Sequence, residues 1–465
     1  MAVKGYVDFV DVEAVAGWVL NEDVPEGEAI VDVFAGNRYA GSAVADIHAP
    51  DLYAAGLPHA ARRFKFLHPE RLQYADLPAV MVYEHDHHQQ LDGNFDQFRA
   101  YLASKYNTPE TLMPYCVFFD VKADFDPSLE AYRVAVSGDV RIESDRFSDV
   151  KFRIPDEISG TTKLGLPTRG RASNFWFYPE SNNLGFQFDA TIRKPQDDLV
   201  RVELTYLDAG KLVTMPVAVT PVGKLAEECA SLIPEPAMIE RVIGPTSDAW
   251  KSYVVGGWTN ASQLGWMCEK YMGRGLAELD KILDWGCGCA RNTLPIARLA
   301  GQNAQVSGVD IDPVNIAWSK EHISEATFEV SGLLPPLDFA DNSFDVVYGL
   351  SIFTHLTELA QDLWLAELCR VLKPGGVAFL TFHGEAAAYS RGFSAAEIEN
   401  YRLRGIEDYV LDRALIEVVD DSNYYRSTFH TTDYLRSRWS KYFDIVGIEG
   451  TTGGYQWFAA CQKRK

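Results

Sequence analysis

The sequence has no long apolar run, no excess of basic residues and few cysteines. It contains no stretch of about 18 consecutive apolar residues, so no membrane-spanning helix is predicted. Its first residues also lack the apolar segment and the small-residue cleavage site of a secretory signal. Lys and Arg number 43 against 65 Asp and Glu, which gives a net charge of −22. Nucleic acids and anionic membranes require a basic surface, so we expect neither as a partner.

The cysteines are too few and too scattered to predict a disulfide framework or a metal site. There are seven of them, an odd number in a long chain, so we expect reduced thiols and a cytoplasmic location. Cys287 and Cys289 lie close together, but a zinc site usually needs a second pair, which is missing. The histidine-rich run from His85 to His88 is interpreted as a solvated loop. We therefore expect no metal.

The 465 residues are enough for about three domains, and the hydrophobic pattern changes twice along the chain. Residues 1–93 contain short alternating runs typical of a small β-domain, and 94–109 are expected to form a helical connector. Strand-like segments at short spacing over 110–222 favour a β-sandwich. A proline-containing linker, 223–245, leads to 246–465, where strands alternate with helices as in a parallel sheet.

A glycine-rich turn near residue 286 is the most informative segment. The sequence KILDWGCGCAR predicts an apolar strand that ends in Asp284-x-Gly286-x-Gly288, before a helix that begins near Asn292. Glycines let a ligand approach the backbone closely. The N-terminus of a helix offers unpaired N–H groups and a positive dipole end to a carboxylate or phosphate. A ligand site is therefore predicted at the carboxyl edge of the sheet.

Two acidic residues at the end of the next predicted strand support this interpretation. Asp310 is placed to accept hydrogen bonds from both hydroxyls of a ribose. Asp312, followed by a proline, is expected to cap the next helix. The alternative for the turn is a generic Rossmann-like element that binds NAD or nothing, and for Asp310 it is a capping role.

Further motifs follow in register, with DNSFDVVY at 341–348, GLSIFTHL at 349–356 and ELCRVLKPGG at 367–376. Together with the glycine turn, they make residues 246–465 resemble the class I S-adenosylmethionine-dependent methyltransferases of the bacterial methyltransferase-domain family. The resemblance implies a Rossmann-like α/β fold with a seven-stranded sheet that ends in an antiparallel hairpin. It also implies S-adenosylmethionine as the cofactor and methyl transfer as the reaction.

The resemblance also implies a set of cofactor contacts. These are Asp284, Gly286, Gly288 and Arg291 for the methionine moiety, Asp310 for the ribose, Ile311, Gly332 and Leu333 for the adenine, and Gly349 and Ser351 beside the sulfonium. Two positions depart from the family pattern. Ala290 stands where the family has a third glycine, and we expect it to be tolerated because the helix has begun there. No acidic residue ends the third strand, so the backbone of Gly332 and Leu333 is expected to contact the adenine.

The acceptor half of the edge carries several candidates for acid–base chemistry. A neutral alcohol is a poor nucleophile, so its methylation needs a base near the hydroxyl. His355 follows the fourth strand and His383 the fifth, and both are candidates for that base, with a structural role as the alternative. Tyr424, Tyr425 and His430 precede the last hairpin and are candidates for acceptor contacts, with packing under a lid as the alternative.

The front half of the chain loosely resembles modules attached to bacterial glycan-modifying enzymes, through VAGWV at 15–19 and the hairpin that follows. The aromatic run Phe175–Tyr178 is a candidate for sugar stacking or for strand packing. We therefore expect an O-methyltransferase for a sugar, glycan precursor or other small molecule, with β-domains that recruit the acceptor or form a homo-oligomer. The alternatives are N- or C-methylation of a small metabolite or lipid, and an inactive binding scaffold.

Overall fold

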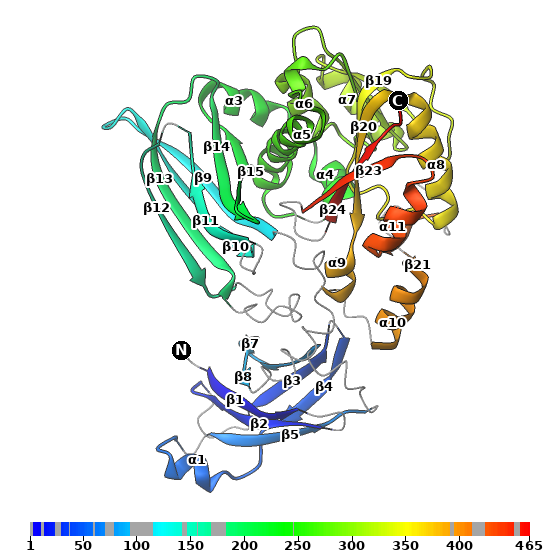
Figure 1. The fold of residues 1–465 in the computed structure, drawn as a ribbon. Coiled ribbons are helices and arrows are strands. Elements are labelled where there is room, and N and C mark those ends of the chain that lie inside the picture. The colour runs from blue at the N-terminus through cyan, green and yellow to red at the C-terminus, as the bar shows by residue number, and fades with distance from the viewer. Residues whose placement is uncertain are drawn as a thin grey trace. The chain divides into compact units, whose positions relative to one another are not determined.

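The computed structural model divides the chain into two compact units (Figure 1). It describes residues 3–10, 14–23, 29–36, 38–58, 61–69, 79–93, 115–141, 147–155, 157–168, 183–244, 246–390, 395–411, 424–450 and 456–465. Met1–Thr111, Thr168–Asn183 and Glu385–Leu403 make up the first unit, and Leu112–Pro167, Leu184–Gly384 and Arg404–Lys465 make up the second. The predicted connector 94–109 and the aromatic run Phe175–Tyr178 lie outside the described residues. None of the described helices is long and apolar enough to cross a membrane.

The first unit contains two sheets of four strands each in its described part. One has the order β5-β2-β1-β8, with β5 (Arg62–Leu67), β2 (Ala14–Asn21), β1 (Val3–Val10) and β8 (Asp92–Gly93). The other has the order β4-β3-β6-β7, with β4 (Arg38–Val44), β3 (Ile30–Ala35), β6 (Val80–Glu84) and β7 (Gln89–Gln90). Alternate valines of these strands, among them Val7, Val19, Val33 and Val82, share one core with Phe64. The helices α1 (Pro50–Ala54), α9 (Glu385–Ser390) and most of α10 (Ala395–Arg404) also belong to this unit.

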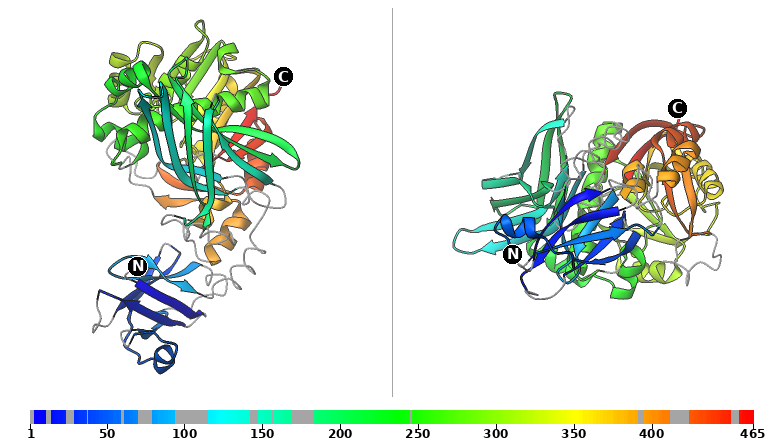
Figure 2. Two further views of the ribbon diagram at one scale, coloured as in Figure 1. Left: turned by 90° about the vertical axis from the view of Figure 1, so that its left-hand side faces the viewer. Right: turned by 90° about the horizontal axis from the view of Figure 1, so that it is seen from below.

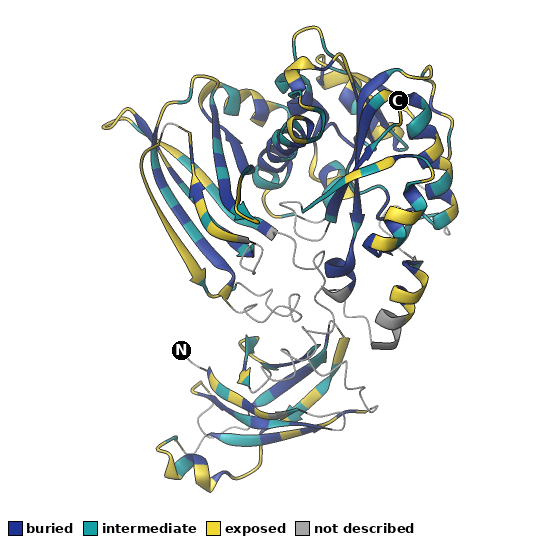
Figure 3. Cartoon of the chain, viewed as in Figure 1, coloured by how far each residue is buried: buried dark blue, intermediate teal, exposed yellow. Residues whose placement is uncertain are grey.

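The second unit begins with a β-sandwich (Figures 1 and 2). Its larger sheet has the order β12-β13-β10-β9, with β12 (Glu157–Leu166), β13 (Gly185–Arg193), β10 (Ala131–Arg141) and β9 (Tyr115–Asp126). Its smaller sheet has the order β11-β14-β15, with β11 (Phe147–Arg153), β14 (Leu199–Asp208) and β15 (Lys211–Pro221). Alternate apolar residues of both sheets, such as Val134, Phe186 and Val202, form one core. Strand β12 is exposed along its length (Figure 3), because the smaller sheet does not cover it.

Helices connect the sandwich to the α/β part of the second unit. The segment expected as a linker forms α3 (Gly223–Ser231) and α4 (Pro236–Ile243), and η4 (Trp250–Val255) and α5 (Gly256–Met272) follow. Helix α5 packs on β15, where the Val219 N–H donates to the Thr259 hydroxyl at 2.9 Å. The apolar side chains of this connection also enclose Cys289, which belongs to the glycine-rich turn. The connection is therefore part of the wall around the predicted ligand site.

The α/β part is built on one mixed sheet with a buried centre (Figure 3). Five parallel strands have the order β18-β17-β16-β19-β20: β16 (Lys281–Trp285), β17 (Gln305–Asp310), β18 (Thr327–Val330), β19 (Phe344–Gly349) and β20 (Leu372–His383). They alternate with α6 (Thr293–Leu299), α7 (Pro313–His322) and α8 (Glu358–Val371), and η5 (Leu276–Glu278) precedes β16. The neighbouring strands β16 and β19 are followed by connections that run in opposite directions, since β16 leads to β17 on one side and β19 leads to β20 on the other. That point is where open α/β sheets bind ligands.

The predicted count of seven strands is too low, because in the described residues this sheet has nine. The predicted final hairpin is present as β23 (Asp444–Gly450) and β24 (Gln456–Gln462), with β24 antiparallel to β20. The two additional strands, β21 (Ile406–Leu411) and β22 (Arg426–His430), come from the excursion before α11 (Thr432–Trp439). Strand β22 pairs with β20 at a single position, where His383, the last residue of β20, lies opposite Phe429. Strand β22 therefore extends the sheet at the carboxyl edge.

Candidate functional site

The glycine-rich turn after β16 is held against the end of β17. The N–H groups of Gly286 and Cys287 both donate to the carbonyl of Val309, at 2.8 and 3.0 Å. Gly286 and Gly288 have φ values of 76° and 52°, which favour glycine. A Cβ atom at Gly286 would lie 2.1 Å from the Cδ1 atom of Ile352. Both the backbone conformation and the close packing therefore require glycine at this position.

Ala290 adopts a conformation that differs from the expectation. It was expected to be tolerated as part of a helix, but α6 begins only at Thr293 and the φ of Ala290 is 61°. The alanine therefore lies in the left-handed region, which costs an L-residue about 1 kcal/mol. Its amide donates to the Cys287 carbonyl at 3.1 Å, so the tight turn imposes this conformation.

Asp310 joins the turn to the next helix. One of its carboxylate oxygens accepts a hydrogen bond from the Gly288 N–H, and the other accepts one from the Asp312 N–H, both at 2.8 Å. Asp312 caps α7 as predicted, because its side chain accepts from the Val314 N–H at 2.8 Å. Burial raises the pKa of Asp310. The carboxylate thus lies at the point of the edge between β16 and β17 that a ribose would reach.

Two ionisable side chains lie buried beneath the turn, and neither has a charged partner among the residues described. Asp284 accepts from the Thr293 hydroxyl at 2.6 Å through one oxygen, while its other oxygen has no partner. Burial raises the pKa of this carboxyl to about 7. The guanidinium of Arg291 packs against Gly256 at the start of α5, and its buried Nε has no hydrogen-bond partner.

Arg291 has no acidic side chain within ion-pair distance among the residues that the structure describes. Burial lowers the pKa of its guanidinium. A buried cation is costly unless an anion or several hydrogen bonds compensate it. The position next to a glycine turn therefore suits an anionic group of a bound ligand. The guanidinium donors fit the carboxylate of a methionine moiety.

An aromatic cluster lines the edge next to the turn. The Trp285 ring lies 4.9 Å from the Trp364 ring and 5.4 Å from the Phe353 ring, measured between centroids. The Trp364 indole N–H and the Tyr424 hydroxyl both donate to the Leu333 carbonyl. Both lone pairs of that carbonyl are then used. This carbonyl is therefore not available to accept from the amino group of an adenine, and the N–H groups of the segment could donate only to its ring nitrogens.

The two candidate histidines are oriented in the same way. His355 Nδ1 lies 2.9 Å from the Arg426 carbonyl, and its ring stacks on Tyr425 with centroids 4.2 Å apart. His383 Nδ1 lies 3.1 Å from the Thr428 carbonyl, and its ring stacks on Phe429. A carbonyl oxygen only accepts, so Nδ1 carries the proton in both rings. In the neutral form Nε2 therefore holds the lone pair that could accept a proton.

The comparisons with known proteins identify this part of the chain. Residues 282–376 match a family model described as a methyltransferase domain. A sterol 24-C-methyltransferase of Gibberella zeae is 34% identical over 102 residues, which are 21% of this chain and 26% of that protein. A ubiquinone biosynthesis O-methyltransferase of Mesorhizobium japonicum is 32% identical over 103 residues, 22% of this chain and 39% of that protein. The chain thus spans well under half the length of these two curated relatives.

The match over residues 282–376 supports a class I S-adenosylmethionine-dependent methyltransferase domain in this part of the chain. The matched segment begins on β16 and ends within β20, so it includes the glycine turn, Asp310 and the edge after β19. A crystal structure of magnesium protoporphyrin IX methyltransferase from Synechocystis PCC 6803 with bound SAH is 17% identical to this chain. The matched region covers 51% of this chain and 94% of that protein's chain, and the TM-score is 0.32.

The remaining candidates of the methyltransferase domain differ in their surroundings. Tyr424 and Tyr425 are half-buried, and their contacts to Leu333 and His355 connect the two sides of the edge. His430 is fully buried, and its Nε2 lies 2.9 Å from the Oε1 atom of Gln361. Burial lowers the pKa of His430 to about 3. These contacts give His430 a packing role. No motif in the sequence identified its partner, Gln361, in advance.

The two sequences considered as metal ligands make other contacts. Cys287 and Cys289 are buried beneath the turn, and burial raises the pKa of both thiols. His85 Nδ1 lies 2.7 Å from Asp32, and His87 bridges Glu84 and Asp23 at 3.0 and 2.8 Å. Within the described residues no group of three or more potential ligands is arranged to hold a metal ion.

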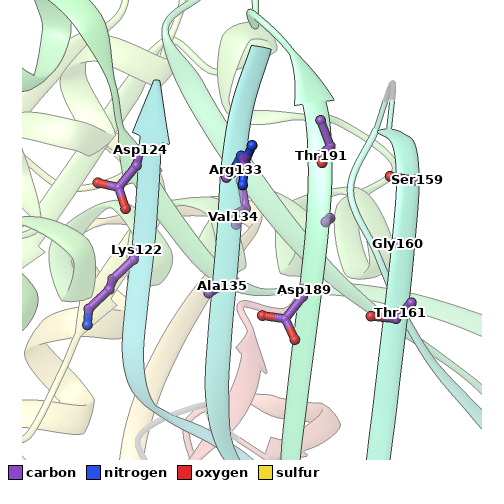
Figure 4. Close-up of a pocket in the computed structure, with 11 residues that line it drawn as sticks. Lys122, Asp124, Arg133, Val134, Ala135, Ser159, Gly160, Thr161, Asp189 and Thr191 are labelled. Carbon is purple, nitrogen blue, oxygen red and sulfur yellow. The ribbon is translucent and has the colours of Figure 1, made fainter. Parts of the chain in front are cut away.

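The outer face of the larger sandwich sheet carries a polar hollow of about 360 Å³ (Figure 4). Ala135 lies at its centre, directly across from Lys122 on one neighbouring strand and Asp189 on the other. The next row along the sheet places Arg133 between Asp124 and a threonine. Cationic, anionic and hydroxyl groups thus alternate around a small side chain. Hydrogen-bonding groups of both kinds suit a neutral ligand with many hydroxyls.

Proposed function

We propose that this chain is an active S-adenosylmethionine-dependent methyltransferase. The observation that carries the proposal is the buried Arg291 guanidinium, which lies beside the glycine turn and has no acidic partner in the described part of the chain. When bound, S-adenosylmethionine supplies a methyl group that its sulfonium has already activated. Arg291, with Gly286 and Gly288, would hold the methionine moiety, and Asp284 would lie beneath it. Asp310 would accept hydrogen bonds from the ribose, with Ile311 against the adenine.

The residues of this chain would contribute mainly orientation and proton removal. Displacement at an activated methyl group requires the acceptor atom to be held in line, which a rigid edge between packed strands favours. For an alcohol acceptor, His383 or His355 would accept the hydroxyl proton at Nε2, since Nδ1 of each ring donates to a backbone carbonyl. If the acceptor were a carbon or an amine with its own lone pair, neither histidine would be required.

For the acceptor we propose an oxygen of a sugar or a glycan-related molecule. The polar hollow on the sandwich supports this choice, because its carboxylates, cations and hydroxyls can bind a neutral polyhydroxylated chain. The net charge of −22 opposes a polyanionic acceptor such as nucleic acid. The two relatives named above include one C- and one O-methyltransferase, so N- or C-methylation of a metabolite or lipid is the alternative.

Two experiments test these proposals. Calorimetry with S-adenosylmethionine tests the cofactor, and an absence of binding at millimolar ligand would support an inactive scaffold instead. Mass spectrometry of a cell extract incubated with the protein and methyl-labelled S-adenosylmethionine then identifies the acceptor by the gain of one methyl group. His383→Ala and His355→Ala are compared in the same assay. Nearly unchanged turnover in both would rule out an alcohol acceptor activated by these histidines.

A further inference from the structure

Ser351 has an unusual backbone conformation at the carboxyl end of β19. Its φ is 60°, in the left-handed region that residues with a side chain seldom adopt. The residue lies two positions after Gly349, which is the last residue of β19. Gly349 packs against Trp285 on one side and Leu380 on the other. Such a conformation persists only where the surroundings impose it, and it is often found at ligand sites.

Two polar side chains hold Ser351 in this conformation. Its N–H donates to the hydroxyl of Thr381 at 2.6 Å, and Thr381 is fully buried in β20. Its own hydroxyl oxygen accepts a hydrogen bond from the side-chain amide of Gln456, the first residue of β24. A serine hydroxyl has one proton and two lone pairs. Because the oxygen accepts from Gln456, the proton of Ser351 is left to donate to another group.

The partners of Ser351 all lie on the acceptor side of the edge. In the sheet, the strands of the glycine turn, β16 and β17, lie on one side of β19, and β20 and β24 lie on the other. Thr381 shares a face of β20 with His383, two residues on, and Gln456 is the direct cross-strand neighbour of His383. Ser351 is therefore fixed toward the strand that carries one of the two candidate bases.

We propose that Ser351 contacts the methyl acceptor, with its hydroxyl donating to an oxygen of that molecule, and that Thr381 and Gln456 are positioning residues that fix this hydroxyl. The inference rests on the proposed function and deepens it, because it selects acceptors that bear oxygen near the methylated atom. It also favours His383 over His355 as the neighbouring base, since only His383 shares this set of partners.

The first test uses Ser351→Gly, with Ser351→Ala beside it. Glycine removes the hydroxyl and tolerates a positive φ, so this variant should fold at least as well as the parent chain. The probe is the extract fraction that becomes methylated in the labelling experiment above, titrated against methyl-labelled S-adenosylmethionine. Both variants should raise its half-saturating concentration about tenfold, as expected for the loss of one hydrogen bond. If Ser351 contacted the cofactor, as the family resemblance implies, both variants would weaken S-adenosylhomocysteine; a contact to the acceptor predicts that this affinity, measured by calorimetry, is unchanged.

The second test addresses the positioning residues. Thr381→Val and Gln456→Leu should raise the same half-saturating concentration while leaving affinity for S-adenosylhomocysteine intact. Thr381→Ser keeps the hydroxyl and should restore the parent value, which a loss of packing alone would not predict. If Ser351→Gly leaves the half-saturating concentration unchanged, or weakens S-adenosylhomocysteine instead, the proposal is overturned while the proposed function stands. A parent chain that binds no S-adenosylhomocysteine and methylates nothing overturns both.

Discussion

The carboxylate of Asp310 accepts a hydrogen bond from the backbone N–H of Gly288, at 2.8 Å. This contact links the end of β17 to the glycine turn that follows β16, so that one acidic side chain both fixes the turn and lies at the ligand edge. Its other oxygen accepts from the Asp312 N–H at the start of α7. The geometry of the turn and the predicted ribose contact therefore depend on the same residue.

Replacing Asp310 should weaken cofactor binding. In Asp310→Ala, we expect affinity for S-adenosylmethionine to fall at least tenfold, or about 1.4 kcal/mol, because the ribose hydroxyls lose their acceptor. Calorimetry measures this change. Asp280→Ala is the matched control, since Asp280 is exposed and lies before β16 at the opposite end of the strand. Equal affinity in Asp310→Ala and the parent chain would mean that the ribose contact is misassigned.

Replacing Arg291 should weaken cofactor binding without lowering the stability of the fold. Because its buried guanidinium has no acidic partner among the described residues, Arg291→Met should leave the melting temperature unchanged or raise it. The same variant should bind S-adenosylhomocysteine at least tenfold more weakly, about 1.4 kcal/mol, while 5′-methylthioadenosine, which lacks the carboxylate, binds as before. Both affinities are measured by calorimetry.

Arg298→Met provides the control for that experiment. Arg298 lies in the helix after the turn and pairs with Glu228 and Glu325, so its loss removes surface ion pairs without touching the ligand edge. It should lower stability slightly and leave both affinities unchanged. A fall in 5′-methylthioadenosine affinity in Arg291→Met would show that the guanidinium supports the whole pocket rather than the carboxylate.

Asp284 should make stability depend on pH. Burial raises its pKa in the folded state to about 7, above its usual value near 3.8. Between these values the unfolded chain is ionised while the folded chain still holds the proton, so stability falls as pH rises from about 4 to about 7. Asp284→Asn cannot ionise. It should match the parent near pH 4 and exceed it at pH 8 by on the order of a few kcal/mol, measured by denaturant unfolding. An equal difference at both pH values would contradict the assignment.

Ala290 offers a simple gain in stability. Its φ of 61° suits glycine better than alanine, so Ala290→Gly should stabilise the chain by about 1 kcal/mol. The opposite change at Gly288, whose φ is 52°, should destabilise it, because a Cβ there would lie 2.7 Å from Val242. Thermal unfolding of the two variants compares them directly. Unchanged stability in Ala290→Gly would mean that the turn gains nothing from the left-handed preference of glycine.

The parts of the fold that repeat a strong local pattern could be predicted from the sequence. The strands β16, β17, β19 and β20 are apolar and end in turns or caps, and Asp312 caps its helix as expected. Strand β22 could not be found in this way, because its sequence RSTFH is polar although most of it is buried. The Thr428 hydroxyl donates to the Leu356 carbonyl at 2.9 Å, which satisfies in the core a group that the pattern assigns to the surface.

The residues of the candidate site also divide into those that local sequence predicts and those that it does not. Asp310, Arg291 and the glycines follow from spacing along the chain, because the turn that positions them is local. Gln456 and Thr381 reach Ser351 from other strands, and only the order of the sheet brings them together. Strand β12 is hard to predict for another reason. Its ten residues are nearly all exposed and include glycines, so no alternating apolar face marks it as a strand.

The histidines of the first unit should give it a pH-dependent stability. His87 bridges the buried Glu84 and Asp23, and these two carboxylates raise the pKa of His87; Asp32 raises the pKa of His85 in the same way. A raised pKa in the folded state means that the stabilisation is complete below about pH 6.5 and is lost as pH rises through the folded-state pKa.

Hydrogen exchange in β6 and β7, corrected for intrinsic rates, should therefore speed up between pH 6 and pH 8. The double variant His85→Gln, His87→Gln should remove this change, whereas His48→Gln, whose partner is the neutral Tyr53 hydroxyl, should keep it. If the double variant retains the full pH dependence, these ion pairs do not stabilise the unit.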